Sequence, residues 1–277
     1  MVKGLLKKVT VGILSTVMIF SLVSCSNSKE AGQKPSGIVD KIKQSKKIIL
    51  ATNPEFPPFE FRTVKSGKSE VVGADIALAQ EIAKDLGVKL EIKSMNFDGL
   101  LEALNAGNID MVVAGMTPTD KRRQSVDFSE LYYKDSPQTL LIRKENAGKI
   151  KSVNDLKGLT VGAQKGSIQE EIVKNEFKAS KPKAVANIPN LIQELKNKNI
   201  DALVLEKVVA EQWIKKTGTD ITMAPFEVGV NYSGIAVAIK KGNKDLVDSV
   251  NKTIARVEKE NLMQKFIKDA NALNEKK

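Results

Sequence analysis

The chain has 277 residues, enough for one large or two small domains, and its formal net charge is +11. It contains no histidine, which excludes histidine-based catalytic triads and the usual histidine-containing zinc sites. Its single cysteine excludes an intrachain disulfide and any cysteine-cluster metal site, so we expect neither a bound metal ion nor a cofactor.

Residues 1–24 have the features of a lipoprotein signal peptide. Three lysines stand near the start, and the apolar stretch 9–23 is broken by small polar residues and is short for a membrane span of ~20 residues. The sequence LVSC that ends at Cys25 resembles a bacterial lipobox, in which the cysteine is lipidated and becomes the mature N-terminus. The alternative is an ordinary signal peptide with a chance cysteine. We expect lipidation at Cys25 and a protein anchored at the cell membrane, facing the extracellular or periplasmic side.

A polar segment follows the predicted lipidation site. Residues 26–37 are mostly small or polar and bury too little apolar surface to become ordered, so we expect 25–40 to form a flexible tether. No run of basic residues is interleaved with aromatic ones. We therefore interpret the positive charge as a solvated surface near anionic lipid or wall polymer, and expect no nucleic-acid partner.

From Lys46 onward, predicted strands and helices alternate. The apolar patterns predict strands at 48–51, 88–92 and 109–114 and helices at 76–86 and 97–106. After Pro137 the pattern restarts, with strands at 139–142, 160–163, near 184 and at 202–205, and helices that begin near 167, 189 and 206. Strands separated by helices of this length indicate parallel sheets covered on both faces, which is the α/β class.

Two segments of the chain resemble each other. Residues 100–115 (LLEALNAGNIDMVVAG) and 191–206 (LIQELKNKNIDALVLE) align without gaps. One explanation is that the protein has two similarly built lobes. The alternative is that the two segments share only the general pattern of a helix, a turn and a buried strand. In either case Gly115 and Glu206 occupy the same place, the carboxyl end of a buried strand, which is where ligands bind in open α/β sheets.

The loop after Gly115 has the composition of an anion receptor. Glycine permits close backbone approach, Thr117 supplies a hydroxyl and an N–H, and Arg122 lies in the first turn of a helix that Thr119 can cap. N–H groups together with a guanidinium form a good carboxylate receptor. The alternative is a capped surface helix whose charges are solvated.

Two further loops are candidates for the same site. Ser167 and Glu170 fit a capping box, so a helix begins there and its free N–H groups can meet an anion, although capping alone also explains Ser167. The proline-rich segment 53–61 follows the first strand and contains three phenylalanines. We expect Phe56 to form an apolar wall of the site and the other two to lie in the core. Phe97 is a second candidate wall, with core packing as the alternative.

Together these segments resemble the family 3 extracellular solute-binding proteins, which deliver polar amino acids to ABC importers. The resemblance covers nearly the whole chain after residue 45. The matching runs are FPPFEF (56–61), GADIALAQEIAKDLG (73–87), MNFDGLLEALNAGNIDMVVAGMTPTDKR (95–122), VDFSELYY (126–133), LKGLTVGAQKGS (156–167), NIDALVLE (199–206) and YSGIAVAIKKGN (232–243).

The resemblance implies a two-lobed, periplasmic-binding-protein-like α/β fold of type II with two hinge crossings. Lobe 1 would contain residues 41–133 and 231–277, and lobe 2 residues 134–230. The crossings would fall near 132–136 and 228–232.

The resemblance also implies the roles of individual residues. Arg122 would pair with the ligand α-carboxylate, helped by the N–H groups of Thr117 and Ser167. The α-ammonium would meet the Gly115 carbonyl, the Thr117 hydroxyl and Glu206, where the family usually has aspartate.

Four residues would surround the ligand side chain by the same resemblance. Phe56 and Phe97 would sandwich it, and Gln164 would lie where relatives make further contacts. Asn53 stands where glutamine-binding and basic-amino-acid-binding relatives often have aspartate, and its neutral amide weakens the case for a cationic ligand.

The function that follows is capture of a polar or basic L-α-amino acid by hinge closure and its delivery to the permease and ATPase of an ABC importer. We expect a monomer without catalytic activity. One alternative is a cyclohexadienyl dehydratase-like enzyme on the same fold, with Glu206 or Glu55 as the general acid. Another is a lipoprotein that senses amino acids or mediates adhesion.

Overall fold

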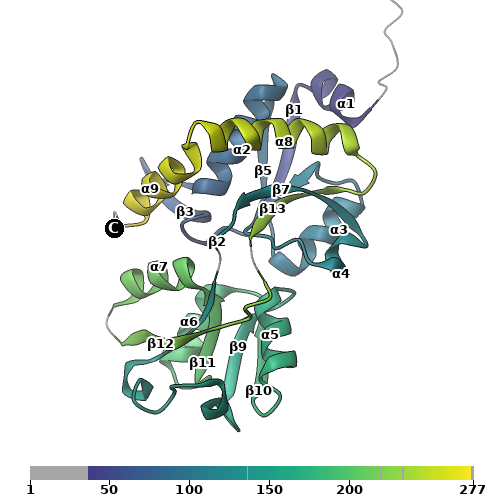
Figure 1. Cartoon of the computed structure of the whole chain (residues 1–277). Coiled ribbons are helices and arrows are strands. Elements are labelled where there is room, and N and C mark those ends of the chain that lie inside the picture. Colours follow the sequence, from purple (N-terminus) through teal and green to yellow (C-terminus); the bar gives the residue numbers. More distant parts are fainter. Residues whose placement is uncertain (1–36, 136, 219, 233, 276–277) are drawn as a thin grey trace, which may run out of the picture. The chain divides into compact units, whose positions relative to one another are not determined.

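The computed structural model describes residues 37–135, 137–218, 220–232 and 234–275 (Figure 1). The predicted signal peptide, the predicted lipidation site at Cys25 and most of the predicted tether lie outside these ranges. Helix α1 (Ile38–Ser45) begins within the range 25–40 that we expected to be a tether. Residues 38–40 of that range are therefore helical. No helix in the described ranges is long and apolar enough to cross a membrane.

The first of two large sheets defines lobe 1, and its strand order is β5-β1-β6-β13-β7. Strand β1 pairs in parallel with β5 and β6, whereas β13 runs antiparallel to β6 and β7. The strands are β1 (Lys47–Thr52), β5 (Lys89–Ser94), β6 (Met111–Val112), β7 (Val126–Tyr133) and β13 (Ile235–Lys240). The helices that follow α1 in this lobe are α2 (Ala74–Leu86), α3 (Leu100–Asn105), α4 (Asp120–Arg123), α8 (Lys244–Lys259) and α9 (Leu262–Asn274).

Both faces of this sheet are buried, as the α/β class requires. Successive side chains of a strand point to opposite faces. In β13, Ile235, Val237 and Ile239 join the hydrophobic cluster that contains α2 and α8, while Ala236 and Ala238 join the cluster that contains α3. A small antiparallel sheet of β2 (Glu55–Phe56), β3 (Glu60–Lys65) and β4 (Lys68–Val72) lies beside α2.

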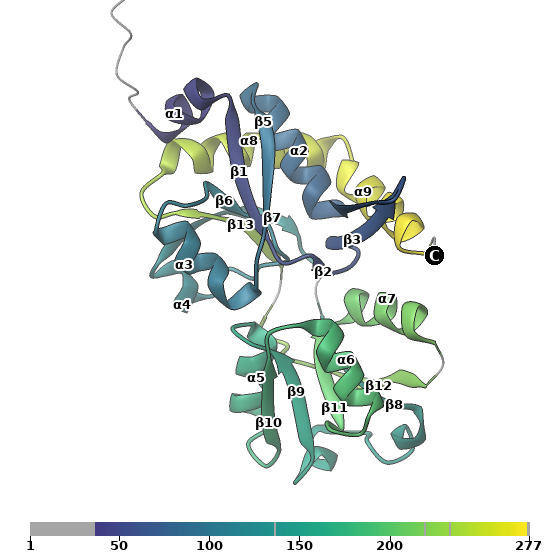
Figure 2. The ribbon, with the colours of Figure 1, turned by 180° about the vertical axis from the view of Figure 1, so that it is seen from behind.

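The second large sheet defines lobe 2, and its strand order is β10-β9-β11-β8-β12. The strands are β8 (Gln138–Arg143), β9 (Thr160–Gln164), β10 (Lys181–Val185), β11 (Ala202–Glu206) and β12 (Ile221–Val228), and the helices are α5 (Ile168–Glu176), α6 (Ile188–Lys196) and α7 (Lys207–Thr217). The chain enters this lobe between β7 and β8 and leaves it between β12 and β13 (Figures 1 and 2). It therefore crosses between the two sheets twice.

The two aligned segments occupy equivalent places in the two lobes. Each runs from a helix into a strand that pairs in parallel with a neighbour, β6 with β1 and β11 with β9. The shared aspartate does the same work in each. Asp110 Oδ2 accepts from the Ile49 N–H at 2.7 Å, and Asp201 Oδ2 accepts from the Thr160 N–H at 2.9 Å.

Most predicted elements are present, with differences where local geometry intervenes. The predicted apolar stripe of α2 is buried, and the helix ends at Gly87 with φ of 72°. The predicted strand 109–114 is regular only over Met111–Val112, because the loop turns towards the site at Gly115, whose φ is 55°. The predicted helix 97–106 begins as a 3-10 turn over Phe97–Gly99 and becomes α-helical at Leu100.

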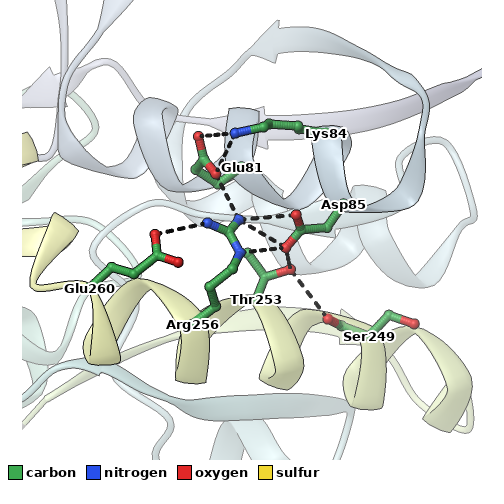
Figure 3. Close-up of polar contacts among 7 residues, drawn as sticks. All are labelled: Glu81, Lys84, Asp85, Ser249, Thr253, Arg256 and Glu260. Atoms are coloured by element: carbon green, nitrogen blue, oxygen red, sulfur yellow. Dashed lines mark hydrogen bonds and ion pairs between the residues drawn. The ribbon is translucent and has the colours of Figure 1, made fainter.

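A polar network joins α2 to α8 on the outside of lobe 1 (Figure 3). The Arg256 guanidinium donates to Glu81 at 2.7 Å and to Asp85 at 2.9 Å, and the Thr253 hydroxyl donates to Asp85 at 2.9 Å. The hydrogen bond from Arg256 lowers the pKa of Glu81. The first N–H groups of α2, those of Ala74 and Asp75, donate to the carbonyls of Pro58 and Phe59, which lie between the pocket residues Phe56 and Glu60. By fixing α2, the network therefore helps hold the frame on which lobe 1 carries its half of the site.

Candidate ligand-binding site

A pocket lies where loops of lobe 1 and lobe 2 meet. Strand ends and helix starts supply its walls, because parallel strands of both sheets terminate there. Eight of the nine predicted ligand residues line it: Asn53, Phe56, Phe97, Gly115, Thr117, Arg122, Gln164 and Ser167. The structure adds four that the sequence did not single out for it: Glu60, Ala114, Ile168 and Gln169.

Glu206, the ninth predicted residue, is not one of the described residues that line this pocket. It ends β11, is 2% exposed and immediately precedes α7. Its charge acts on Glu60 and Tyr132, which places it near the acidic side of the pocket wall.

Arg122 is held by both lobes. Thr119 caps α4 by accepting from the Arg122 N–H at 3.3 Å, as predicted. The guanidinium donates to the Thr117 carbonyl at 2.8 Å and to the Gly166 carbonyl of lobe 2 at 3.0 Å. It also lies over the Phe97 ring, 5.4 Å from the centroid. Burial lowers the pKa of Arg122 to about 10, so it remains a cation at neutral pH.

Two amides face each other across the lobes. Gln164 Nε2 donates to Asn53 Oδ1 at 2.9 Å and to the Ala186 carbonyl at 3.2 Å. Asn53 Nδ2 donates to the Met95 carbonyl at 3.1 Å. The two side chains therefore form one polar wall that contains no charge.

The start of α5 differs from the predicted capping box in one respect. Ser167 Oγ accepts from the Glu170 N–H at 3.2 Å, as such a box requires. The Glu170 carboxylate, however, accepts from the Gly166 N–H at 2.7 Å rather than from Ser167. Lys165, between Gln164 and Gly166, is exposed and forms an ion pair with Asp98 at 2.9 Å.

Phe56 packs against the backbone of Gly115. A Cβ at position 115 would lie 2.7 Å from a Phe56 ring carbon, so both the positive φ and the contact require glycine there. Phe59 and Phe61 are 0% and 4% exposed, which confirms their predicted place in the core. Phe97 is buried among core residues and also lines the pocket.

Two buried acidic residues were not predicted from the sequence: Glu60, which lines the pocket, and Asp75, which lies behind Gly115. Glu60 and Asp75 are 1% and 0% exposed, and their carboxyl groups are hydrogen-bonded to each other. Asp75 Oδ2 also accepts from the Gly115 N–H at 2.9 Å and from the Tyr132 hydroxyl at 2.8 Å. Burial raises the pKa of Asp75 to about 6 and that of Glu60 well above its ordinary value. In the described parts of the chain, neither carboxyl group is hydrogen-bonded to a basic side chain.

One signal could have pointed to Glu60. It stands between Phe59 and Phe61, which are both expected in the core. Because side chains alternate along a strand, an acid between two core residues faces away from that part of the core. Here it faces the pocket. Asp75 gave no comparable signal, since an acid in the first turn of a helix is ordinarily solvated.

Comparison with known proteins gives a consistent result. Residues 48–269 match the family described as "Bacterial extracellular solute-binding proteins, family 3". The arginine-binding extracellular protein ArtP of Bacillus subtilis (strain 168) is 34% identical over 95% of this chain and 97% of its own. The L-cystine-binding protein TcyJ of Escherichia coli (strain K12) is 31% identical over 91% of each chain.

Solved structures agree with the sequence relatives. The amino acid ABC transporter substrate-binding protein AbpA of Streptococcus pneumoniae, bound to L-arginine, has a TM-score of 0.83 and 37% identity, over 86% of this chain and 100% of its own. An ancestral amino-acid-binding protein described as a precursor of cyclohexadienyl dehydratase has a TM-score of 0.76 and 31% identity, over 84% of this chain and 99% of its own. These matches confirm the predicted two-lobed α/β fold.

Proposed function

Because the chain belongs to the bacterial extracellular solute-binding proteins of family 3, we propose that it binds an L-α-amino acid with a cationic side chain, arginine first. The protein captures the amino acid outside the cytoplasm when its two lobes close, and delivers it to an ABC importer. The observation that supports a cationic side chain is the position of the Glu60 carboxyl group in the pocket.

The α-carboxylate of the ligand pairs with Arg122 in this proposal. A zwitterion that leaves water needs a partner for each of its charges, because a buried unpaired charge is very costly. The Arg122 guanidinium donates to one backbone carbonyl in each lobe and also lines the pocket. A guanidinium has five N–H donors, so it can bind a carboxylate in the pocket in addition to these carbonyls. The N–H groups of Thr117 and Ser167 assist, and Glu206 with the Gly115 carbonyl and the Thr117 hydroxyl receives the α-ammonium.

The ligand side chain extends between Phe56 and Phe97 towards Glu60. Both rings line the pocket together with this carboxyl group, and a planar guanidinium stacks well on aromatic faces. Glu60 Oε2 has no hydrogen-bond partner among the described residues, so it is available to a donor. The neutral pair of Asn53 and Gln164 therefore does not argue against a cationic ligand, since Glu60 supplies the ionisable carboxyl group that Asn53 lacks, and a ligand cation beside it would favour its charged form.

Calorimetry with single amino acids tests this function. We expect arginine to bind most tightly among arginine, lysine, ornithine, histidine, glutamine and cystine. Arg122→Ala should abolish binding of all of them. Glu60→Gln should weaken arginine binding at least tenfold and leave glutamine binding within threefold. Equal losses for arginine and glutamine would remove Glu60 from the side-chain subsite, and near-normal affinity of Arg122→Ala would remove Arg122 from the carboxylate subsite.

We propose no catalytic role for the pocket. A dehydratase of this fold needs a general acid beside the leaving hydroxyl. Glu55, one of the two candidates from the sequence, accepts two hydrogen bonds from lobe 2 and is not among the pocket residues. Incubation with prephenate or arogenate and a search for an aromatic product would reveal the enzyme if it existed.

We further propose that the protein is a monomeric lipoprotein, anchored through Cys25 after removal of residues 1–24. The support is the basic start, the apolar stretch and the lipobox-like LVSC of the sequence. Metabolic labelling with a fatty acid should mark the wild-type chain and leave Cys25→Ser unlabelled. Its importer is expected to be a permease with an ATPase, and a sensing or adhesion role would need a partner other than these.

A further inference from the structure

Several contacts between the lobes lie outside the ligand pocket, and one of them involves Glu55. Glu55, in β2 of lobe 1, accepts two hydrogen bonds from lobe 2. Its Oε1 accepts from Asn187 Nδ2 at 2.9 Å, and its Oε2 accepts from the Ile188 N–H at 2.9 Å. Asn187 is the N-cap of α6 and Ile188 is the first residue of that helix. The carboxylate of one lobe therefore caps a helix of the other.

Helix α6 depends on this cap because it lacks one of its own. The N–H groups in the first turn of an α-helix have no partner within the helix. Asn187 makes no capping hydrogen bond to α6 with its side chain, and Pro189 has no N–H. A carboxylate is also favoured at this end of a helix by the helix dipole. Separation of the lobes would return both the carboxylate and the Ile188 N–H to water.

The other contacts between the lobes, within the described ranges, are of three kinds. Some involve pocket residues, such as the bond from Gln164 to Asn53 and the bond from Arg122 to the Gly166 carbonyl. Others are exposed ion pairs, which contribute little because water competes with them. The pairs are Lys165 with Asp98, Lys121 with Glu171, and Lys215 with Glu275, whose lysine side chains are 60%, 80% and 55% exposed. The third kind is an uncharged contact, in which Asn274 Nδ2 of α9 donates to Gln212 Oε1 of α7 at 3.1 Å.

Glu55 differs from all three kinds. It is half-buried, its bonds are charge-assisted, and none of the three residues involved lines the pocket. Its neighbours on each side nevertheless belong to the site. Phe56, the next residue, is a pocket wall, and the carbonyl of Ala186, just before Asn187, accepts from Gln164. The contact therefore sits directly behind the walls that close on the ligand.

We propose that Glu55 is a positioning residue for ligand capture. By capping α6 from the opposite lobe it stabilises the arrangement in which the lobes contact each other, and it thereby slows the release of bound amino acid. This inference rests on the lobe closure in the function proposed above, but not on the identity of the ligand. Because the cap forms only after the lobes meet, its loss acts on the dissociation rate more than on the association rate.

Stopped-flow kinetics with L-arginine test the proposal on the full chain. Glu55→Ala should raise the dissociation rate at least tenfold and leave the association rate within threefold. Lys165→Ala, which removes an exposed ion pair between the same lobes, is the matched control and should change both rates less than twofold. A dissociation rate of Glu55→Ala within twofold of wild type overturns the proposal.

A charge swap separates capping across the lobes from a local structural role. Asn187→Asp alone places a carboxylate against Glu55 and should raise the dissociation rate, although aspartate is a good N-cap for α6 itself. The double variant Glu55→Gln with Asn187→Asp lets the new amide donate to the new carboxylate. We expect it to recover most of the wild-type dissociation rate. A double variant no slower than Asn187→Asp alone contradicts the proposal.

A distance measurement covers the case in which arginine is not the ligand. Fluorophores on cysteines introduced by Lys43→Cys in lobe 1 and Lys157→Cys in lobe 2, in a Cys25→Ser background, report the separation of the lobes in the chain without added amino acid. Glu55→Ala should shift the distribution to longer distances, and Lys165→Ala should not. An unchanged distribution overturns the proposal, whereas failure of wild type to bind arginine contradicts only the proposed ligand.

Discussion

The segments 100–115 and 191–206 begin alike and end differently. In both, a shared aspartate accepts from an N–H of a neighbouring parallel strand, Asp110 from Ile49 in lobe 1 and Asp201 from Thr160 in lobe 2. After that point β6 stops at Val112 and the chain turns at Gly115, whereas β11 continues to Glu206 and runs directly into α7. The same framework thus supports a loop of N–H groups and a guanidinium on one side and a single buried carboxyl group on the other.

The difference separates residues that stabilise the sheets from residues that we assign to ligand binding. Residues up to the strand serve the sheet in both lobes, and in our proposal Gly115 and Glu206, at the ends of the two segments, serve the site. Changes at Gly115 and Glu206 should therefore affect binding, and the corresponding changes in the shared framework should affect stability.

Gly115→Val should produce the largest effect. The new side chain meets the Phe56 ring and must adopt a φ of 55°, which β-branched residues disfavour strongly. We expect loss of detectable arginine binding in calorimetry and a fall in the melting temperature of several degrees. Gly87→Ala is the control, because Gly87 has a similar φ of 72° and nothing within 4 Å of a new Cβ. It should cost about 1 kcal/mol of stability and leave binding intact; a Gly115→Val chain that binds normally would contradict the placement of this loop.

Glu206→Ala tests the other end of the comparison. If this carboxylate receives the α-ammonium, its removal should cost on the order of 2–5 kcal/mol of binding free energy, since a buried charged partner is lost. Isothermal titration with arginine measures it. Asp201→Ala, the framework residue in the same segment, should lower the melting temperature and change the affinity less than threefold. Unchanged affinity of Glu206→Ala would move the ammonium subsite elsewhere.

Asp75→Asn tests the buried acids behind Gly115 through their pH dependence. Burial raises the pKa of Asp75 to about 6, so the native state holds this proton to higher pH than the unfolded chain does. The resulting stability is full below about pH 4 and is lost as the pH rises through about 6, a change of up to about 3 kcal/mol. Asparagine cannot ionise, so the variant should flatten this decline in urea unfolding measured from pH 4 to 8. Asp248→Asn, at an exposed position, should leave the curve unchanged; a wild-type curve that rises over this range would contradict the assignment.

Lys121→Ala should have the smallest effect. It breaks an ion pair with Glu171 whose lysine side chain is 80% exposed, and such pairs contribute ~0–1 kcal/mol. We expect arginine affinity within threefold of wild type at low salt and no difference at high salt, where exposed charges are screened. A tenfold loss that persists at high salt would mean that this pair, and not the Glu55 cap alone, controls closure.

The sequence predicts the framework well because strand ends and caps are local properties. The apolar stripe of α2, the cap at Thr119 and the turn at Gly115 follow from spacing and residue type, and eight predicted residues meet in one pocket. The burial of Glu60 and Asp75 could not be predicted in this way, because it depends on residues far away in the chain. Tyr132 and the Gly115 N–H, which bind Asp75, are 57 and 40 positions away.

The two crossings between the lobes impose an order of assembly. Lobe 2 is one continuous stretch of chain, whereas β13, which lies between β6 and β7 in lobe 1, is supplied only by residues 235–240. During synthesis, which starts at the N-terminus, the chain can complete lobe 2 while β6 and β7 still lack β13, the strand that lies between them. The half of the site that carries Arg122 is therefore completed last, and truncation before residue 235 should leave lobe 2 folded and lobe 1 unable to form.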